Sequence, residues 1–163
     1  MSVNKYKPHV LVLPEDDADR QIANGFCTEL GVNHRNIQIL PEVGGWKIVV
    51  EVFTKVHALE MRKLPYRSVV LLIDFDGHIN RLDEVRQQIP EELNNRVFIL
   101  GVLSEPEELK KSTGKSFEYI GRELAHNCVN GKDGLWEHDL LKHNNSELER
   151  MIKLVKSFLF DKS

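Results

Sequence analysis

The sequence has few of the features that mark secreted or membrane proteins. Only two of its 163 residues are cysteines, Cys27 and Cys128, without a Cys-x-x-Cys pair or zinc-ligand spacing. This argues against a disulfide framework and a structural zinc site, and both thiols are expected to be reduced and buried. The apolar runs are too short for a membrane span, and the polar start lacks a signal-peptide core. These absences favour a cytoplasmic protein.

An excess of positive charge is also missing. The chain carries 22 Lys and Arg against 25 Asp and Glu, which gives a formal net charge of -3. The molecule as a whole therefore has no basic field that would attract nucleic acid or anionic lipid. Binding to nucleic acid would require a local patch or a metal.

The remaining composition is that of a globular domain. Hydrophobic residues make up 41% of the chain and charged residues 29%, and there is no repeat or low-complexity segment. A chain of this length can bury a hydrophobic core. We therefore expect a single domain over residues 1–163, with a core at about 8–105 and a C-terminal helical part at about 106–163.

Short apolar runs predict four strands, at residues 9–14, 36–40, 68–73 and 96–102. Nearly continuous apolar and β-branched runs are typical of strands that helices cover on both faces. Segments whose apolar residues recur at helical spacing lie between these runs. Strands that alternate with helices imply right-handed crossovers. The sequence therefore predicts an α/β fold with three layers and a mostly parallel, four-stranded sheet.

The helices are expected at about 17–31, 46–62 and 81–88, and from residues 107, 116 and 144 onward. In the first helix Ile22, Phe26 and Leu30 recur at helical spacing, and Gly31 suits its end. The inward face of the second is expected to carry four residues, Ile48, Val52, Val56 and Leu59. The last helix has an apolar stripe that should dock on the sheet, formed by Leu148, Met151, Ile152, Val155 and Phe158.

Acidic residues follow three of these strands. Glu15 ends the first, Asp74 and Asp76 follow the third, and Glu105 follows the fourth. Because ligands bind beyond the carboxyl ends of parallel strands, these residues should share one edge of the molecule. Carboxylates gathered at one place repel unless a cation neutralises them, and Mg²⁺ or Mn²⁺ prefers oxygen ligands. The sequence therefore predicts a divalent metal site.

Other polar residues have simpler interpretations. Asp16, Asp17 and Asp19 are explained by the favourable interaction of acidic groups with a helix N-terminus. The segment 128–145 contains His138 and His143, and is more typical of a structured surface loop than of a catalytic site.

Two of these motifs resemble the Toprim domain, a metal-binding module of topoisomerases, bacterial primases and OLD-type nucleases. The Toprim pattern has a glutamate at the end of its first strand, as in Val10-Leu-Val-Leu-Pro-Glu15. It then has Asp-x-Asp after a later strand, as in Leu71-Leu-Ile-Asp74-Phe-Asp76. The resemblance covers about the first two thirds of the chain, and the family's glycine after the glutamate is Asp16 here.

Small OLD-like members are also similar in having a Gly-Gly turn and a basic residue after the second strand, here Gly44-Gly45-Trp46-Lys47. A further acidic position follows a later strand in those relatives, and Glu105, or Glu107 as a substitute, resembles it. No topoisomerase, primase or ATPase domain accompanies the motifs in this chain.

The resemblance implies a metal-dependent reaction that cleaves or transfers phosphodiesters of DNA or RNA. Glu15 would act as a metal ligand or general acid/base, and Asp74 and Asp76 would hold the metal. Lys47 would join Glu15 in catalysis. The substrate phosphate would contact the Gly44-Gly45 turn and positive charge from Lys47, Arg20 or His78.

Three alternatives remain open. Leu71 to His78 resembles the first motif of the haloacid dehalogenase phosphatases, with His78 in place of a threonine. A response-regulator receiver is similar in architecture, with Glu15-Asp16-Asp17 as its acidic pocket and Asp74 as phospho-acceptor. A Toprim-like sheet could also serve as a non-catalytic binding or regulatory module. A homodimer is conceivable through an edge strand or the last helix.

Overall fold

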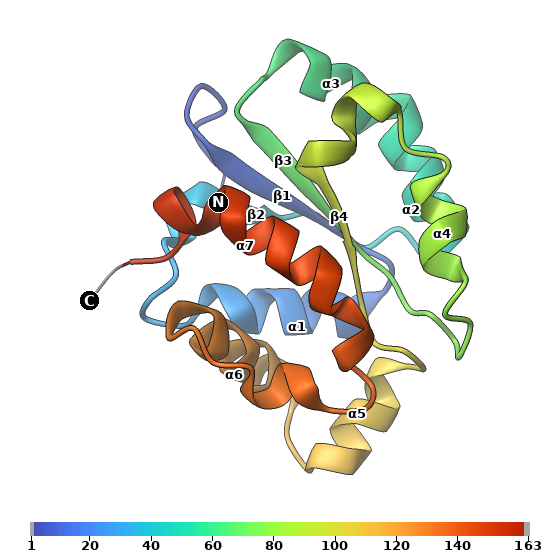
Figure 1. Cartoon of the computed structure of the whole chain (residues 1–163), viewed down its shortest axis with the longest axis vertical. Helices are drawn as coiled ribbons and strands as arrows, with labels where there is room; N and C mark the ends of the chain where they lie inside the picture. Colours follow the sequence, from blue (N-terminus) through green and yellow to red (C-terminus); the bar gives the residue numbers. More distant parts are fainter. Residues whose placement is uncertain (1, 162–163) are drawn as a thin grey trace.

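The computed structural model describes residues 2–161 as an open sheet with helices on both faces (Figure 1). Its strands are β1 (His9–Pro14), β2 (Ile37–Ile39), β3 (Arg67–Leu72) and β4 (Val97–Leu100). They are all parallel and lie in the order β2-β1-β3-β4. The α/β class and the parallel four-stranded sheet predicted from the sequence are confirmed.

Helices form the two outer layers. One face of the sheet carries α1 (Asp17–Cys27), α5 (Pro106–Thr113), α6 (Phe117–Val129) and α7 (Asn145–Leu159). The other face carries α2 (Trp46–Val52), α3 (Ala58–Lys63) and α4 (Arg81–Arg86) (Figure 1). Short 3₁₀ turns cover His34–Asn36, Glu91–Arg96, Gly134–Glu137 and Lys142–Asn144. No helix within residues 2–161 has the length and apolarity needed to cross a membrane.

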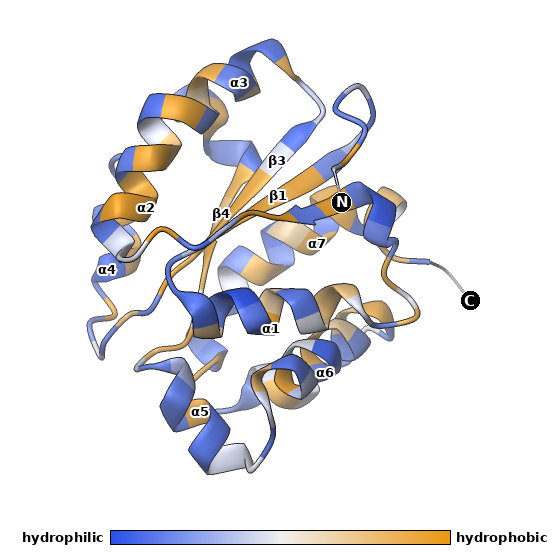
Figure 2. Ribbon diagram, turned by 180° about the vertical axis from the view of Figure 1, so that it is seen from behind, coloured by the Kyte–Doolittle hydropathy of each residue, from blue (hydrophilic) through white to orange (hydrophobic). Residues whose placement is uncertain are grey.

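The core lies on both faces of the sheet because every residue of β1 is buried. Side chains alternate along a strand, so Val10 and Val12 join the cluster beneath α1 and α7. Leu11 and Leu13 join the cluster beneath α2 and α3. The strands accordingly show as hydrophobic between helices of mixed character (Figure 2). This double burial explains why the strand runs are continuous rather than alternating.

The two cysteines lie on helices of the same layer and are free thiols. Burial raises the pKa of Cys27 to about 11 and that of Cys128 to about 12. Both are therefore protonated near neutral pH. Cys128 is buried as predicted, whereas Cys27 is only half-buried.

Helix α1 ends earlier than the sequence predicted. It stops at Cys27, where the Thr28 hydroxyl donates to the Gly25 carbonyl at 2.7 Å. The chain then turns so that Val32 can bridge to Phe160. Leu30 is therefore 93% exposed and is not an inward residue of the helix.

The second predicted helix forms, but its inward face was assigned wrongly. Residues 46–63 are helical throughout, with a π-helical turn at Phe53–His57 between α2 and α3. The buried side chains are Val49, Val50, Phe53, Ala58 and Met61. The segment has two apolar stripes, and the bulkier one, with Phe53 and Met61, packs on the sheet. In the other stripe Ile48, Val56 and Leu59 are exposed, whereas Val52 is half-buried against the core.

Helices α1 and α6 cross at two glycines. A Cβ atom on Gly121 would lie 1.8 Å from the Ile22 carbonyl oxygen, and one on Gly25 would lie 2.0 Å from that of Glu118. Both obstructing atoms belong to the backbone, so a side chain at either position would force the helices apart. The close crossing brings α6 onto α1, which in turn carries Asp16 and Asp19.

Gly121→Ala is therefore expected to destabilise the protein by about 1–3 kcal/mol, the usual cost of overpacking. In a helix without this contact the same change would stabilise by about 0.5–1 kcal/mol. Urea unfolding followed by circular dichroism measures the difference. Gly114→Ala is the comparison, because a Cβ there has open space and only the left-handed backbone (φ 69°) opposes it. A neutral Gly121→Ala would mean that the two helices can separate freely.

Candidate metal centre

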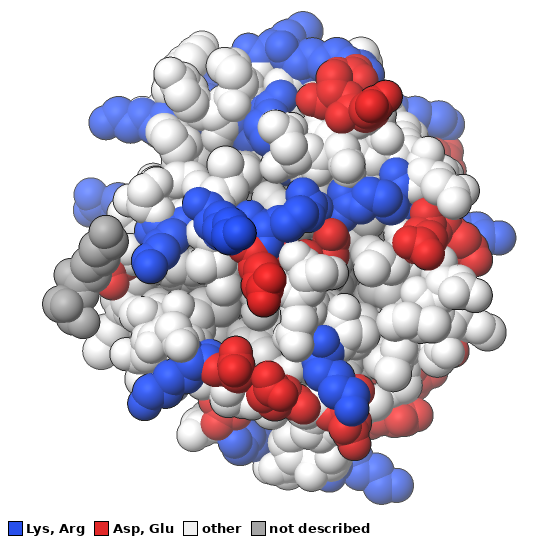
Figure 3. All heavy atoms as spheres, viewed as in Figure 1, with Lys and Arg blue, Asp and Glu red and all other residues white. Residues whose placement is uncertain are grey.

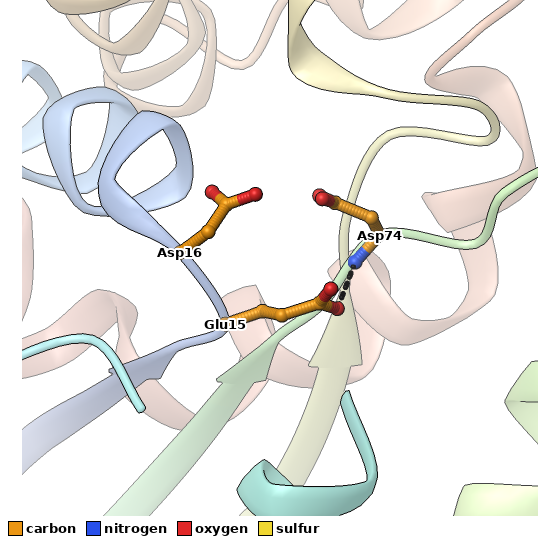
Figure 4. A group of neighbouring side chains, drawn as sticks. All are labelled: Glu15, Asp16 and Asp74. Atoms are coloured by element: carbon orange, nitrogen blue, oxygen red, sulfur yellow. Dashed lines mark hydrogen bonds between the residues drawn. The ribbon is translucent and has the colours of Figure 1, made fainter. Parts of the chain in front are cut away.

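Three carboxylates converge beyond the carboxyl ends of β1 and β3. Glu15 follows β1, Asp16 caps α1, and Asp74 lies two residues beyond β3. One oxygen atom from each lies within 4.8 Å of the others. Figure 4 shows Asp16 and Asp74 pointing toward each other, with Glu15 extending beneath them. This acidic cluster could hold a metal ion.

Backbone contacts fix the cluster. The Asp74 amide donates to Glu15 Oε1 at 2.9 Å (Figure 4). The Asp19 amide donates to Asp16 Oδ1 at 2.9 Å, which is a typical N-cap contact. The Glu15 amide donates to the Leu72 carbonyl at 2.9 Å, so the pairing of β1 with β3 continues as far as the site. The carboxylates are therefore placed by the sheet rather than by a mobile loop.

A fourth carboxylate, Asp19, lies behind these three. Its side chain is fully buried, and no hydrogen-bond donor among residues 2–161 reaches either of its oxygens. Burial raises its pKa well above the usual value, and the neighbouring charge of Asp74 raises it further. Because its neighbours Asp74 and Asp16 are also carboxylates, only a proton or a cation between them can relieve the repulsion.

The pKa values of two other acids in the cluster, Asp74 and Glu15, are also raised. Burial raises the pKa of Asp74 from 3.8 to about 8, with further contributions from Asp16 and Glu15. Burial also raises the pKa of Glu15, although the hydrogen bond from the Asp74 amide opposes the effect. Such perturbed carboxyls in one place are typical of functional sites.

Arg81 supplies positive charge beside the cluster. It donates to the Asp74 carbonyl and to Asp76 Oδ2, both at 2.7 Å, and its guanidinium lies 4.6 Å from the centre of the Trp46 ring. Asp76 has a left-handed backbone (φ 50°), which turns its carboxylate toward Arg81. The structure thus brings Glu15 and Asp74 together but places Asp76 in an ion pair. A metal-ligand role for Asp76 stays a prediction.

Glu105 and Glu107 lie at the start of α5 and are exposed, and Glu105 makes no side-chain cap contact. The preceding segment is close to the site, since the Asp76 amide donates to the Ser104 carbonyl at 3.1 Å. Neither glutamate is a member of the three-residue acidic cluster.

Of the predicted phosphate-binding residues, Gly44 has a hydrogen bond to the backbone of the cluster. The Gly44 amide donates to the Glu15 carbonyl at 2.8 Å, which holds the Gly44-Gly45 turn against the site. Lys47 is exposed in the first turn of α2. Arg20 already pairs with Asp17 and Glu42, and His78 is an exposed turn residue.

The histidine-containing segment 128–145 contributes mainly to packing. Trp136 is buried and donates to the Leu124 carbonyl at 3.1 Å, and His138 contacts the Ser112 hydroxyl at 3.0 Å. The ring of His143 packs edge-on against Phe75, with centroids 4.8 Å apart. The segment is therefore ordered structure, and the absence of a catalytic role for its histidines stays a prediction.

Sequence reasoning underrated Asp16 and Asp19 because each also suits a helix N-terminus. One signal separated Asp19 from an ordinary cap. It shares a helix face with the buried Ile22 and Ala23, at spacings of three and four residues. A carboxylate on the buried face of an amphipathic helix requires a partner.

Comparison with protein-family models, with curated proteins and with solved structures finds no match for this chain. The geometry of the acidic cluster is therefore the basis of the functional proposal.

Proposed function

We propose that this chain is a Toprim-like, cytoplasmic protein that cleaves or transfers phosphodiester bonds of nucleic acid with a divalent metal. The observation that carries the proposal is the convergence of Glu15, Asp16 and Asp74, with the buried carboxylate of Asp19, which no donor among residues 2–161 reaches, beside Asp16 and Asp74. Four acids from two adjacent strand ends are unfavourable together unless a cation or a proton neutralises them. The motifs around Glu15 and Asp74 are also the two that resemble the Toprim pattern.

The donor set fits a hard cation. All candidate ligands are carboxylate oxygens, which suit Mg²⁺ or Mn²⁺ better than softer metals. Asp16 and Asp74 would hold the ion, with Glu15 as a third ligand or as the general acid/base and with Asp19 directly behind. When bound, the ion would supply charge neutralisation and an activated water for attack on a phosphate.

The chain's own groups have separate tasks. Glu15 is fixed by the Asp74 amide, and burial raises its pKa, which favours a role as a group that accepts and returns a proton. Lys47 offers an exposed ammonium next to the Gly44-Gly45 turn. Arg81 keeps the segment after β3 in place through its contact with the Asp74 carbonyl.

Positive charge for a polyanion would have to be local. The net charge of the chain is -3, yet Lys and Arg form a row across the face that carries α7 (Figure 3). Acidic groups lie on both sides of that row. A nucleic acid could therefore find local basic contacts in spite of the acidic total.

Metal binding and cleavage are tested separately. Wild-type protein titrated with Mg²⁺ or Mn²⁺ is expected to gain about 2.7 kcal/mol of apparent stability at a hundred times the dissociation constant. Glu15→Gln should reduce cleavage of single- or double-stranded substrates by at least about 100-fold, because it removes a proton-transfer group. Thermal unfolding and a fluorescent-substrate assay provide the two measurements.

Asp17→Asn is the matched control, since Asp17 lies in the same acidic run but is exposed and bound to Arg20 and Gln21. It should retain both the metal response and the activity. A wild-type protein that shows no stabilisation at millimolar metal would remove the basis of the proposal.

A non-catalytic metal-binding module is the second candidate. One observation favours it: the cations Arg20 and Arg81 are already paired with carboxylates and are not free for a phosphate. Metal-dependent stabilisation without cleavage of any DNA or RNA substrate would select this role.

A further inference from the structure

The helical segment 46–63 carries a second apolar row on its outer face. The row consists of Ile48, Val52, Val56 and Leu59, and is called the outer stripe below. Ile48, Val56 and Leu59 are 42%, 51% and 54% exposed, and Val52 is half-buried. Figure 2 shows that α2 and α3 are coloured hydrophobic over much of their length.

The outer stripe is more than a set of isolated exposed residues. Its members are four, four and three positions apart, which keeps them on one side of a helix. Scattered surface leucines such as Leu30 are ordinary, whereas a continuous apolar row on one element marks an interaction surface. Val52 is half-buried and packs against the core, whereas Ile48, Val56 and Leu59 are exposed and lie outside the core cluster that Val49, Phe53 and Met61 form.

We infer that the outer stripe is the contact through which two copies of this chain pair, with their 46–63 segments antiparallel across a two-fold axis. The stripe is complementary to itself in that arrangement. An axis near Phe53 and Thr54 places Ile48 opposite Leu59 of the second copy. Val56 then lies beside Val52 of the second copy, within one position of exact register, so apolar side chains flank the axis.

Charge also favours the antiparallel arrangement. Lys47 and Glu60 are exposed at opposite ends of the stripe, and the same axis places each opposite the other in the second copy. A parallel arrangement would oppose Lys47 to Lys47 and Glu60 to Glu60. Glu51 and Lys55, which lie between Lys47 and Glu60 in the sequence, form an ion pair within one chain, with Lys55 Nζ 2.7 Å from Glu51 Oε1.

Of the routes to a dimer suggested by the sequence, the last helix and one edge strand, β4, are occupied within the chain, and β2 is the other edge strand. The outer edge of β4 is covered by α7, whose Glu147 accepts from the Ile99 amide at 2.9 Å. The apolar face of α7 is buried on the sheet through Met151, Val155 and Leu159. The outer stripe is the apolar surface that these contacts leave uncovered.

The pair should be weak and reversible. One helix–helix contact buries less than the roughly 800 Å² per partner of a standard stable interface. We therefore expect wild-type protein to shift from monomer to dimer with concentration over the micromolar range in sedimentation velocity. Val56→Glu/Leu59→Glu should weaken the dimer at least about tenfold, because it buries charge at the contact.

Leu30→Glu is the matched control, since it introduces the same charge at an exposed leucine outside the stripe, and its dimer should be unchanged. Lys47→Glu and Glu60→Lys should each weaken the dimer, and combining them in one chain should restore it. Thermal unfolding confirms that each variant is folded. A wild-type protein that stays monomeric at several hundred micromolar overturns the inference. The inference is also overturned if the stripe variants leave the dimer affinity unchanged, or if the combined charge exchange does not restore it.

Discussion

The Asp74→Asn variant is expected to unfold at a higher temperature than wild-type protein at pH 8 when divalent metal is absent. Asp74 is only 5% exposed, and burial raises its pKa from 3.8 to about 8. Asparagine keeps the shape of the side chain but never ionises. The substitution therefore removes a charge that the folded protein without metal accommodates poorly.

The pH dependence fixes the sign of this effect. Between pH 3.8 and about pH 8 the folded protein holds a proton on Asp74 that the unfolded chain has released. Wild-type stability therefore falls as the pH rises through that window, and the contribution of this group is constant above it. Each unit of pKa shift corresponds to about 1.4 kcal/mol, so a difference on the order of 2–5 kcal/mol between variant and wild type should develop.

Unfolding midpoints from pH 4 to 8 in the presence of a chelator measure this difference. Adding Mg²⁺ or Mn²⁺ at pH 8 should make wild-type protein unfold at a higher temperature than the variant, because the ion stabilises the intact cluster and not the variant. Asp17→Asn is the control for removal of an acidic group that is exposed. Parallel pH curves for wild type and Asp74→Asn would show that Asp74 carries no buried charge.

The fold was predictable because three of its four strands contain continuous apolar runs, at residues 10–13, 69–73 and 97–100. β1 and β3 are largely buried on both faces, and their polar residues, His9, Arg67 and Ser68, lie at the strand starts. Parallel strands end at a common edge, and this rule alone brought Glu15 and Asp74 together. These two members of the acidic cluster follow from strand positions without knowledge of any side-chain conformation.

The rest of the cluster depends on local geometry that spacing does not encode. Asp16 caps α1 and also faces Asp74, so the cap pattern concealed its second contact. The Asp-x-Asp spacing suggested that Asp74 and Asp76 act together. The left-handed backbone at Asp76 instead directs its carboxylate to Arg81.

The segment 46–63 illustrates a different difficulty. A helix with two apolar stripes has no single inward face, and periodicity cannot tell which stripe packs on the sheet. The π-helical turn at Phe53–His57 adds a local change of spacing that no pattern predicted. The larger side chains, Phe53 and Met61, are the buried ones.

The open edge of β4 is another feature that only the structure shows. Glu147 is 6% exposed and accepts from the Ile99 amide while pairing with Arg86 and Arg150. Asn144 accepts from the Gly101 amide at 3.1 Å and donates to its carbonyl at 2.9 Å. Side chains around the start of α7 therefore satisfy the backbone groups that an edge strand normally presents to other chains.

Glu147→Ala is accordingly expected to destabilise the protein by about 3–5 kcal/mol, the cost of removing one partner from a buried ion pair. It leaves Arg86 and Arg150 without their shared counter-charge and the Ile99 amide without an acceptor. Urea unfolding should show a lower midpoint with an unchanged slope. Glu147→Gln retains an acceptor for the Ile99 amide and should lose less stability than Glu147→Ala.

Glu149→Ala, an exposed position on the same helix, should change stability by no more than about 0.5 kcal/mol. A loss as small as this in Glu147→Ala would place the network among surface ion pairs, which contribute little. Light scattering during unfolding adds an independent measurement. If Glu147 protects the edge of β4, its alanine variant should aggregate at lower denaturant than Gly121→Ala, which weakens the fold without uncovering a strand.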